Sequence, residues 1–353
     1  MIPFSARERE NARLGNFVFG SDPAVVETLE AAVADYHGRA CAVAFKNRNG
    51  ALDALFSCYA GDEVVLGAMG PSERFLAASR HFTTLRYAEI RLDGTLFEKT
   101  LARTIGPQTA LVVENTFGGI ERGDDALRTP LGDIPAVLDA CRTLAPLTTG
   151  RSAVWSFETL MPAAVEAPAF VLTDDETLHQ TLLVARGGGR IEKTLWNYDL
   201  VKRIEAAAPS MLAADVSLSQ VHTLAETAER LRETAFILHE RLKKHHLFDL
   251  LERRDRDAPD GFTVLLTPPL YCPKEDIFTQ LTRNGVEAAV CCKPVYKTTA
   301  YKDDGVRLDI TEDLYKALLQ LPCHHRLSSA EIETVAETFL AAVETHARRG
   351  CRF

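Results

Sequence analysis

Short apolar segments alternate with amphipathic segments through the first half of this chain of 353 residues. Uniformly apolar strands that are joined by helices are typical of parallel sheets buried on both faces. The alternation therefore predicts an α/β fold: a three-layer αβα large domain with a mostly parallel central sheet. The predicted strands span residues 42–45, 63–66, 85–88, 110–113, 134–138, 153–156 and 170–173, and the predicted helices span residues 23–36, 50–58, 72–81 and 96–104.

The second half of the chain has a different pattern. From about residue 176 the sequence becomes helical, and residues 216–244 are typical of one long charged helix. A smaller α/β pattern follows this helix, and we place the domain boundary at the change near residue 225. We therefore predict a large domain over residues 1–225 and a small C-terminal α/β domain over residues 226–353. The predicted elements of the small domain are strand 262–266, helix 274–284, strand 286–290 and helix 329–346.

The net charge of −9 disfavours nucleic acid or an anionic membrane as a partner. Residues 1–20 are polar and lack the apolar core of a secretion signal, and no apolar run is long enough to span a membrane. The eight cysteines include no CxxC pair, which fits a reduced compartment. Composition thus predicts a cytoplasmic protein with neither a nucleic-acid nor a membrane partner.

We also predict no metal site. Cys291 and Cys292 are adjacent, and adjacent residues on a strand point to opposite faces. Cys323, His324 and His325 are consecutive, but no further Cys or His stands near them at the spacing of a metal site.

Polar residues follow two of the predicted strands. Asp139 ends strand 134–138, and Ser156 ends strand 153–156. Open parallel sheets bind ligands at the carboxyl ends of their strands, so both side chains are candidates for a ligand site.

Several motifs occur in a specific order. Gly-Asp-Glu-Val at residues 61–64, Trp-Ser-Phe at 155–157 and Leu-Pro-Cys-His-His-Arg-Leu-Ser at 321–328 carry the pattern. Together they resemble the DegT/DnrJ/StrS family of sugar aminotransferases, which are pyridoxal-phosphate (PLP) enzymes with the aspartate-aminotransferase fold. The resemblance covers nearly the whole chain and implies a homodimer whose pockets lie at the subunit interface.

The resemblance also implies cofactor contacts. Asp139 stands where the family's carboxylate faces the pyridine nitrogen, and an aromatic ring such as Phe75 would cover the cofactor. Ser156 matches the phosphate-contacting serine. Asn49 and Gly50 occupy the place of the family's phosphate-binding Gly-Thr-Ala turn.

The chain departs from the family pattern around this same pocket. Met161 stands where the family has its Schiff-base lysine, and a thioether can neither form an imine nor transfer a proton. Arg48 replaces the glycine of the phosphate turn, and Arg142 replaces a glutamine. The segment 206–209, Ala-Ala-Ala-Pro, aligns with the family's Asn-Tyr-Arg-Met segment, which contacts the neighbouring subunit's phosphate.

Alternative roles remain for the same residues. Asp139 serves either a pyridine nitrogen or an ion pair with Arg142 three residues later, and we favour the ion pair. If Arg48 and Arg142 both enter one pocket, they would bind an anion there. The alternative is that each side chain is solvated or forms its own ion pair. Glu158 qualifies as a base only if it is buried with a raised pKa. Lys193 is expected on a helix surface and is not a substitute for the missing lysine.

Three functions follow from these features. The first is a divergent sugar-aminotransferase-like protein without PLP–lysine transamination, whose remodelled pocket binds an anionic small molecule such as a nucleotide sugar, or PLP or pyridoxamine phosphate (PMP) without a covalent link. The second is a non-catalytic partner of an active, aminotransferase-like chain. The third is a cofactor-independent enzyme that uses Arg142, Arg48, Asp139 or Glu158.

Overall fold

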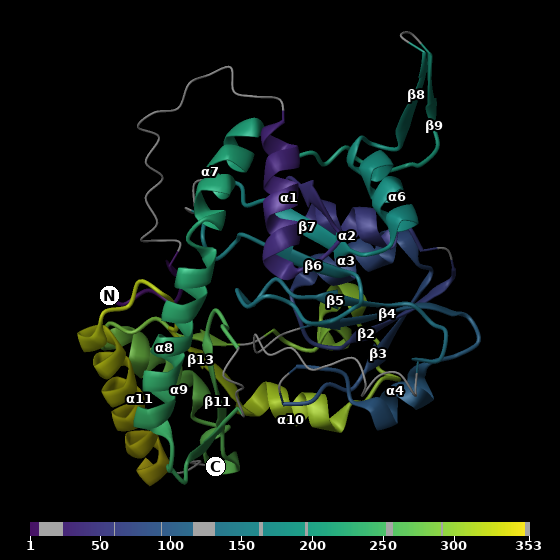
Figure 1. Cartoon of the computed structure of the whole chain (residues 1–353). Coiled ribbons are helices and arrows are strands. Elements are labelled where there is room, and N and C mark those ends of the chain that lie inside the picture. Colours follow the sequence, from purple (N-terminus) through teal and green to yellow (C-terminus); the bar gives the residue numbers. More distant parts are fainter. Residues whose placement is uncertain are drawn as a thin grey trace.

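A seven-stranded sheet forms the centre of the computed structural model (Figure 1). The strand order is β1-β7-β6-β5-β4-β2-β3; all neighbouring pairs are parallel except the two that β7 makes. The structure describes residues 1–6, 24–59, 61–92, 94–115, 131–161, 165–194, 197–251, 257–290 and 292–349. The strands are β1 (Cys41–Phe45), β2 (Glu63–Gly67), β3 (Thr84–Ala88), β4 (Thr109–Asn115), β5 (Ala136–Asp139), β6 (Ala153–Ser156) and β7 (Ala169–Thr173). The predicted mostly parallel sheet is confirmed.

Helices cover both faces of this sheet, which confirms the three-layer architecture. On β6, Trp155 joins the buried cluster on one face, while Val154 joins the cluster on the other. The alternation explains why the strand is apolar throughout. One layer holds α1 (Val25–His37), α7 (Met211–Val221) and α8 (Leu224–Leu242), and the other holds α2 (Arg48–Phe56), α3 (Ser72–His81) and α6 (Glu176–Arg186); α4 (Glu98–Thr104) packs near β3.

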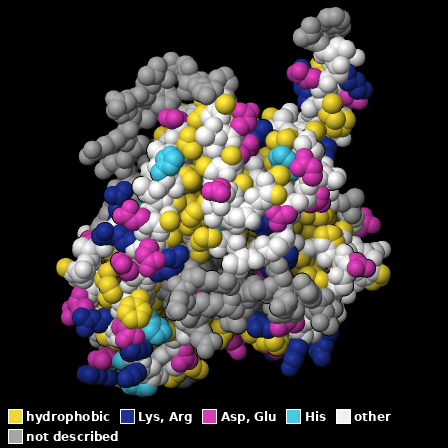
Figure 2. All heavy atoms as spheres, viewed as in Figure 1, with side chains coloured by type: hydrophobic (Ala, Val, Ile, Leu, Met, Phe, Trp, Pro, Cys, Tyr) yellow, Lys and Arg dark blue, Asp and Glu magenta, His cyan; other side chains and the backbone are white. Residues whose placement is uncertain are grey.

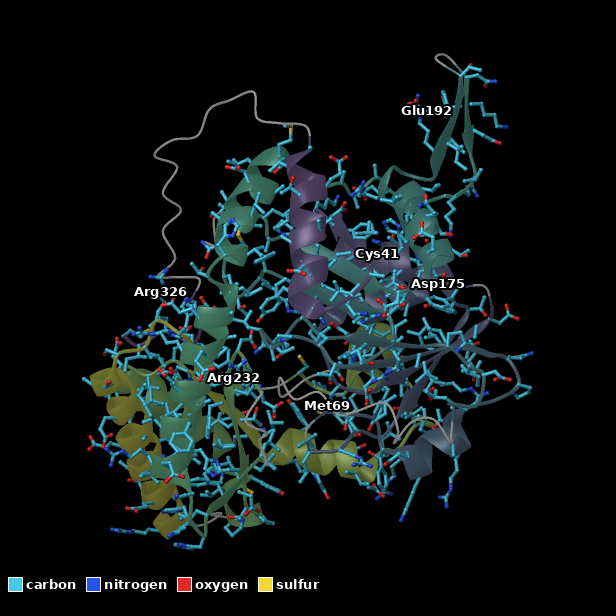
Figure 3. The ribbon with its side chains drawn as sticks, viewed as in Figure 1. Cys41, Met69, Asp175, Glu192, Arg232 and Arg326 are labelled. Atoms are coloured by element: carbon cyan, nitrogen blue, oxygen red, sulfur yellow. The ribbon has the colours of Figure 1, made fainter. Side chains whose placement is uncertain are left out.

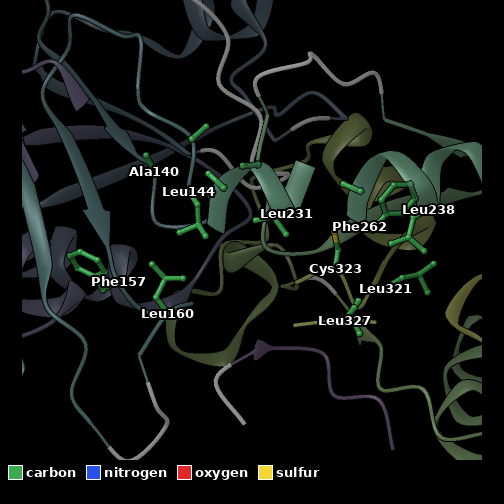
Figure 4. Close-up of a cluster of buried hydrophobic side chains, with 14 of the residues drawn as sticks. Ala140, Leu144, Phe157, Leu160, Leu231, Leu238, Phe262, Leu321, Cys323 and Leu327 are labelled. Carbon is green, nitrogen blue, oxygen red and sulfur yellow. The ribbon is translucent and has the colours of Figure 1, made fainter. Parts of the chain in front are cut away.

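The C-terminal part has its own antiparallel sheet, in the order β10-β11-β13-β12. Its buried side chains continue the core of the large sheet: Figure 4 shows Leu231 and Leu238 of α8 in one cluster with Phe262 of β11. The boundary at residue 225 stays a prediction. The elements are β10 (Phe248–Leu250), β11 (Phe262–Leu266), α9 (Lys274–Arg283), β12 (Ala289–Val290), α10 (Asp309–Ala317), β13 (Leu318–Leu321) and α11 (Ser329–Arg349), with 3-10 turns at Pro268–Leu270, Val295–Lys297 and Thr299–Tyr301.

Two predictions about the middle of the chain are wrong. Residues 216–244 do not form one helix, because α7 ends at Val221 and α8 begins at Leu224. The division lets α7 pack on α1 while α8 packs on α11. Lys193 lies on a β-hairpin and not on a helix. This hairpin consists of β8 (Arg190–Thr194) and β9 (Asn197–Leu200), and its residues are all exposed, so no burial pattern indicated strands.

Two further points concern membranes and cysteines. Within the described residues, none of the helices combines the length and the apolar character needed to cross a membrane. Cys291 lies outside the described residues, so the argument about the Cys291–Cys292 pair stays a prediction.

Candidate functional site

Three polar residues end neighbouring strands at the carboxyl edge of the large sheet. Asp139 ends β5, Ser156 ends the neighbouring β6, and Asn115 ends β4 directly opposite Asp139. All three are buried. The strand ends are therefore placed as the sequence predicts, at the edge where such sheets bind ligands.

Arg48 neutralises Asp139. Its Nη2 donates to Oδ2 of Asp139, and both side chains are buried, with 10% and 1% of their surface exposed. Arg48 is the first residue of α2, and Asn47 caps this helix by accepting a hydrogen bond from the backbone N–H of Gly50 at 3.0 Å. Burial disfavours the charged guanidinium, but the Asp139 carboxylate, together with Cys141 and Glu73, raises the pKa of Arg48. Arg48 thus remains a cation inside the protein.

The expected ion pair between Asp139 and Arg142 is wrong. Nε of Arg142 lies 2.8 Å from Oδ1 of Asp260, and Nη2 of Arg142 donates to the backbone carbonyl of Asp260 at 3.2 Å. Arg48 and Arg142 therefore bind different carboxylates, and whether both face one anion stays a prediction. A spacing of three residues brings side chains together on a helix, whereas this segment follows a strand end and is not helical.

A second arginine, Arg74, is buried, which the sequence pattern did not indicate. Its Nη2 donates to the carbonyls of Gly67 at 3.0 Å and Met69 at 2.8 Å, and its guanidinium carbon lies 5.0 Å from the Phe75 ring centroid. Burial lowers the pKa of Arg74 to about 10, although Asp139 acts in the opposite direction. Gly70, at φ 155°, leaves room for this side chain, since an added Cβ would lie 2.4 Å from Nη2 of Arg74.

Phe75 is a core residue. It is 1% exposed, and its ring centroid lies 6.3 Å from those of Tyr87 and Tyr301. Together with the Arg74 guanidinium, these rings surround it. Its position is explained by packing alone.

Asn49 and Gly50 lie in the first turn of α2 and line a cavity of about 170 Å³, which Lys46 and Arg80 also line. Ala207 packs against this helix start. An added Cβ at Gly50 would lie 2.8 Å from Cβ of Ala207, and the carbonyl of Ala207 accepts a hydrogen bond from Lys46 N–H at 2.7 Å. Ala207 therefore contacts the turn of its own chain that the resemblance assigns to phosphate binding.

Met161 lies in the core. It is fully buried in the cluster between the sheet and α7, and its sulfur accepts a hydrogen bond from Ser217 Oγ at 3.6 Å. Oγ of Ser156 accepts from the backbone N–H of Glu158 at 3.4 Å. The Glu158 residue itself is exposed, so it lacks the burial on which its role as a base depended.

A second cavity, of about 230 Å³, lies where Arg142 meets Asp260. Glu158 and Thr159 add polar groups to the wall of this cavity, and Leu144 is one of its apolar lining residues. Burial raises the pKa of Asp260 to about 7, although Arg142 acts to lower it. The remaining lining residues are Phe4, Ser5, Ala6, Leu231, Cys323, His324 and His325.

A large, mostly parallel sheet between two helical layers, followed by a small antiparallel sheet, is the fold of PLP-dependent transferases. The chain belongs to the DegT/DnrJ/EryC1/StrS aminotransferase family, whose sequence model matches residues 15–340.

Relatives in this family act on nucleotide sugars. The chain is 25% identical over 349 residues to the Campylobacter jejuni UDP-4-amino-4,6-dideoxy-N-acetyl-beta-L-altrosamine transaminase, with 90% of each chain covered. It is 26% identical over 330 residues to the Saccharopolyspora spinosa dTDP-4-dehydro-2,3,6-trideoxy-D-glucose 4-aminotransferase, with 81% of this chain and 79% of the relative covered.

Solved structures share the fold. Helicobacter pylori PseC, an aminotransferase of pseudaminic acid biosynthesis, has a TM-score of 0.84 at 21% identity, with 91% of each chain covered. The sugar aminotransferase CalS13 from Micromonospora echinospora has a TM-score of 0.82 at 18% identity, with 97% of this chain and 100% of CalS13 covered.

The buried ion pair predicts strong energetic coupling. Arg48→Met leaves the Asp139 carboxylate without its cation, and we expect the free energy of unfolding to fall by about 3–5 kcal/mol. The double variant Arg48→Met/Asp139→Asn should lose less than the sum of the two single variants, as measured by urea denaturation. Lys193→Met removes the exposed pair with Asp199 and serves as the control, with an expected change within about 0.5 kcal/mol. Additive single effects would contradict the coupling.

Asp260 predicts a pH-dependent stability. Its folded pKa of about 7 exceeds the value of about 4 for an unfolded aspartate, so its contribution is complete below about pH 4 and is lost as the pH rises through about 7. Asp260→Asn does not titrate, so we expect its free energy of unfolding relative to the parent chain to rise by about 2–4 kcal/mol over that interval. Urea denaturation at several pH values measures this difference. Asp249→Asn, at an exposed residue, is the control, and a constant difference for Asp260→Asn would refute the expectation.

Proposed function

We propose that this chain is a sugar-aminotransferase homologue that does not carry out PLP–lysine transamination and that binds the sugar part of a nucleotide sugar. The first half rests on Met161, which the resemblance places where the family has its Schiff-base lysine and which is fully buried in the core. A thioether has no nucleophilic nitrogen and carries no transferable proton, so Met161 can supply neither the covalent link nor the proton transfer.

The surrounding residues also do not fit the cofactor. Asp139, the carboxylate that would face a pyridine nitrogen, is paired with Arg48. A cation at that carboxylate weakens its attraction for the proton on the pyridine nitrogen. Phe75 is surrounded by Arg74 and two tyrosines and does not present an open face. The related Streptococcus pneumoniae protein Spr1654 has been solved in PLP and PMP forms, at TM-scores of 0.83 and 0.84. The arrangement here argues against both covalent and non-covalent PLP.

The cavity beside Arg142 supports the second half of the proposal. It combines a guanidinium, carboxylates and a hydroxyl with an apolar wall, a mixture suited to the hydroxyl and acyl groups of a modified hexose. Its volume of about 230 Å³ is smaller than the roughly 300–1,000 Å³ of drug-sized pockets, so it suits a sugar rather than a whole nucleotide sugar. The two relatives named above act on UDP- and dTDP-linked sugars.

A homodimer stays our expectation for the assembly, and a second aminotransferase-like chain is the alternative partner. Exposed apolar side chains on and beside the β8–β9 hairpin support a protein partner, and Figure 2 shows yellow side chains on that projection. These side chains are Ile191, Tyr198, Leu200 and Val201.

The cofactor half of the proposal is tested by adding PLP to the purified chain and reducing with borohydride. With one equivalent of PLP we expect no stoichiometric adduct on a lysine of the pocket by peptide mass spectrometry, because Met161 cannot react and exposed lysines such as Lys193 are labelled only in part. Met161→Lys alone should also fail, since Arg48 remains on Asp139, whereas Met161→Lys with Arg48→Gly should gain the adduct. Met161→Leu controls for the loss of the thioether.

PLP fixed on a lysine of the parent chain, together with turnover of a keto sugar, would overturn the proposal. If Met161→Lys alone formed the adduct equally well, the Arg48–Asp139 ion pair would not be what prevents PLP from binding. Because the parent chain is measured first, the test does not depend on the folding of the variants.

The ligand half of the proposal is tested by isothermal titration with UDP- and dTDP-linked amino sugars and with UDP and dTDP alone. We expect a linked sugar to bind and the free nucleotides to bind far more weakly, because the cavity suits the sugar. Arg142→Met should weaken binding by about tenfold or more through loss of a charged hydrogen-bond donor, while Lys193→Met should not. Equal binding by the Arg142→Met variant, or binding by the nucleotide alone, would count against this site.

A further inference from the structure

Three side chains with metal-binding atoms meet at the edge of the large sheet opposite Asp139. Cys41 begins β1 and lies directly across from Thr173, the last residue of β7. Because β7 runs antiparallel to β6, Thr173 lies near the beginning of β6, while Ser156 ends it. After Thr173 the chain turns into α6, whose first turn supplies Glu176 and His179. The cluster is therefore separate from the ligand edge of the sheet.

The geometry is close to that of a zinc site. One ligand atom from each of Cys41, Glu176 and His179 lies within 4.8 Å of the others. Nδ1 of His179 lies 3.6 Å from Oε1 of Glu176, and Sγ of Cys41 lies 3.9 Å from Oε2. Tetrahedral Zn²⁺ with bonds of about 2.0–2.3 Å holds neighbouring ligand atoms about 3.3–3.8 Å apart. The three atoms need only small side-chain rotations to reach that arrangement.

The histidine supplies a second observation. Nδ1 of His179 is shielded from solvent, and Oε1 of Glu176 lies 3.6 Å away, beyond the usual hydrogen-bond distance. A shielded polar nitrogen with only a distant partner is unfavourable, and a metal ion between Nδ1 and the Glu176 carboxylate would satisfy both groups. Glu176 and His179 are three residues apart on one helix, so both side chains lie on the same face.

The surroundings favour a cation. Asp174 adds a negative charge near Cys41, and its carboxylate is fixed by Arg39 Nε at 2.9 Å and by the Ala40 N–H at 2.7 Å. Figure 3 labels Cys41 together with Asp175, the residue that caps α6 by accepting from two backbone N–H groups of its first turn. The helix start is thus already neutralised and does not repel a cation.

We propose that Cys41, Glu176 and His179 bind one Zn²⁺ ion, with solvent as the fourth ligand. A thiolate, an imidazole and a carboxylate match Zn²⁺, whereas Mg²⁺ and Ca²⁺ prefer oxygen ligands only. Glu176 is the outermost ligand, with 72% of its side chain exposed, so a water molecule can reach the fourth position. The ion would fasten the edge strand β1 to α6, and the proposal is independent of the proposed function.

The test titrates the chelator-treated full chain with Co²⁺, which replaces Zn²⁺ and reports its ligands by absorption. We expect one equivalent of Co²⁺ to give tetrahedral bands and a sulfur-to-cobalt charge-transfer band, both abolished by one equivalent of Zn²⁺. Cys41→Ser should remove the charge-transfer band, and His179→Ala should weaken Zn²⁺ binding by at least about tenfold, the loss that even outer-shell changes cause in metal sites.

Cys272→Ser is the matched control, since Cys272 is an exposed cysteine outside the cluster. It should leave the spectrum and the stoichiometry unchanged. Absence of a sulfur-to-cobalt band in the parent chain, or an unchanged band in Cys41→Ser, would overturn the proposal. All three replaced residues lie at least partly at the surface, and circular dichroism of each variant checks that the fold is intact.

Discussion

The buried ion pair between Arg48 and Asp139 constrains the carboxyl edge of the large sheet. Asp139 has almost no contact with water, and a buried carboxylate needs a cation to be tolerated. The cation comes from the first residue of α2, so the helix start, the end of β5 and the charge balance of the pocket depend on one contact. The same contact occupies the carboxylate that a PLP ring would need, which links the fold to the loss of the cofactor that we propose.

Neighbouring residues are adapted to this arrangement. Gly50 allows Ala207 to pack against the start of α2, and Gly70 leaves space for the second buried guanidinium, that of Arg74. Phe75 packs against that guanidinium. The start of α2 and the segment around Arg74 are therefore closely packed against their neighbours.

Buried elements could be predicted from the sequence, whereas exposed elements could not. Strands such as β6 and β11 were placed at their observed residues, because strands buried in a packed core are apolar throughout. The β8–β9 hairpin was missed, because exposed strands carry no such pattern. Arg142 was expected to pair with Asp139 because the two are close in sequence, yet beyond a strand end the chain direction changes, and Arg142 reaches Asp260 instead.

The sequence by itself determined the family, the mostly parallel sheet with Asp139 and Ser156 at its carboxyl edge, and the presence of methionine at residue 161. Only the tertiary structure decided which charges meet. Arg48 and Asp139 are 91 residues apart, and Cys41 and Glu176 are 135 residues apart. The local pattern of apolar and polar residues indicates which residues are buried and which helix or strand they form. The partner of a buried charge or a metal ligand depends on how distant helices and strands pack, and on the direction in which each side chain leaves its element.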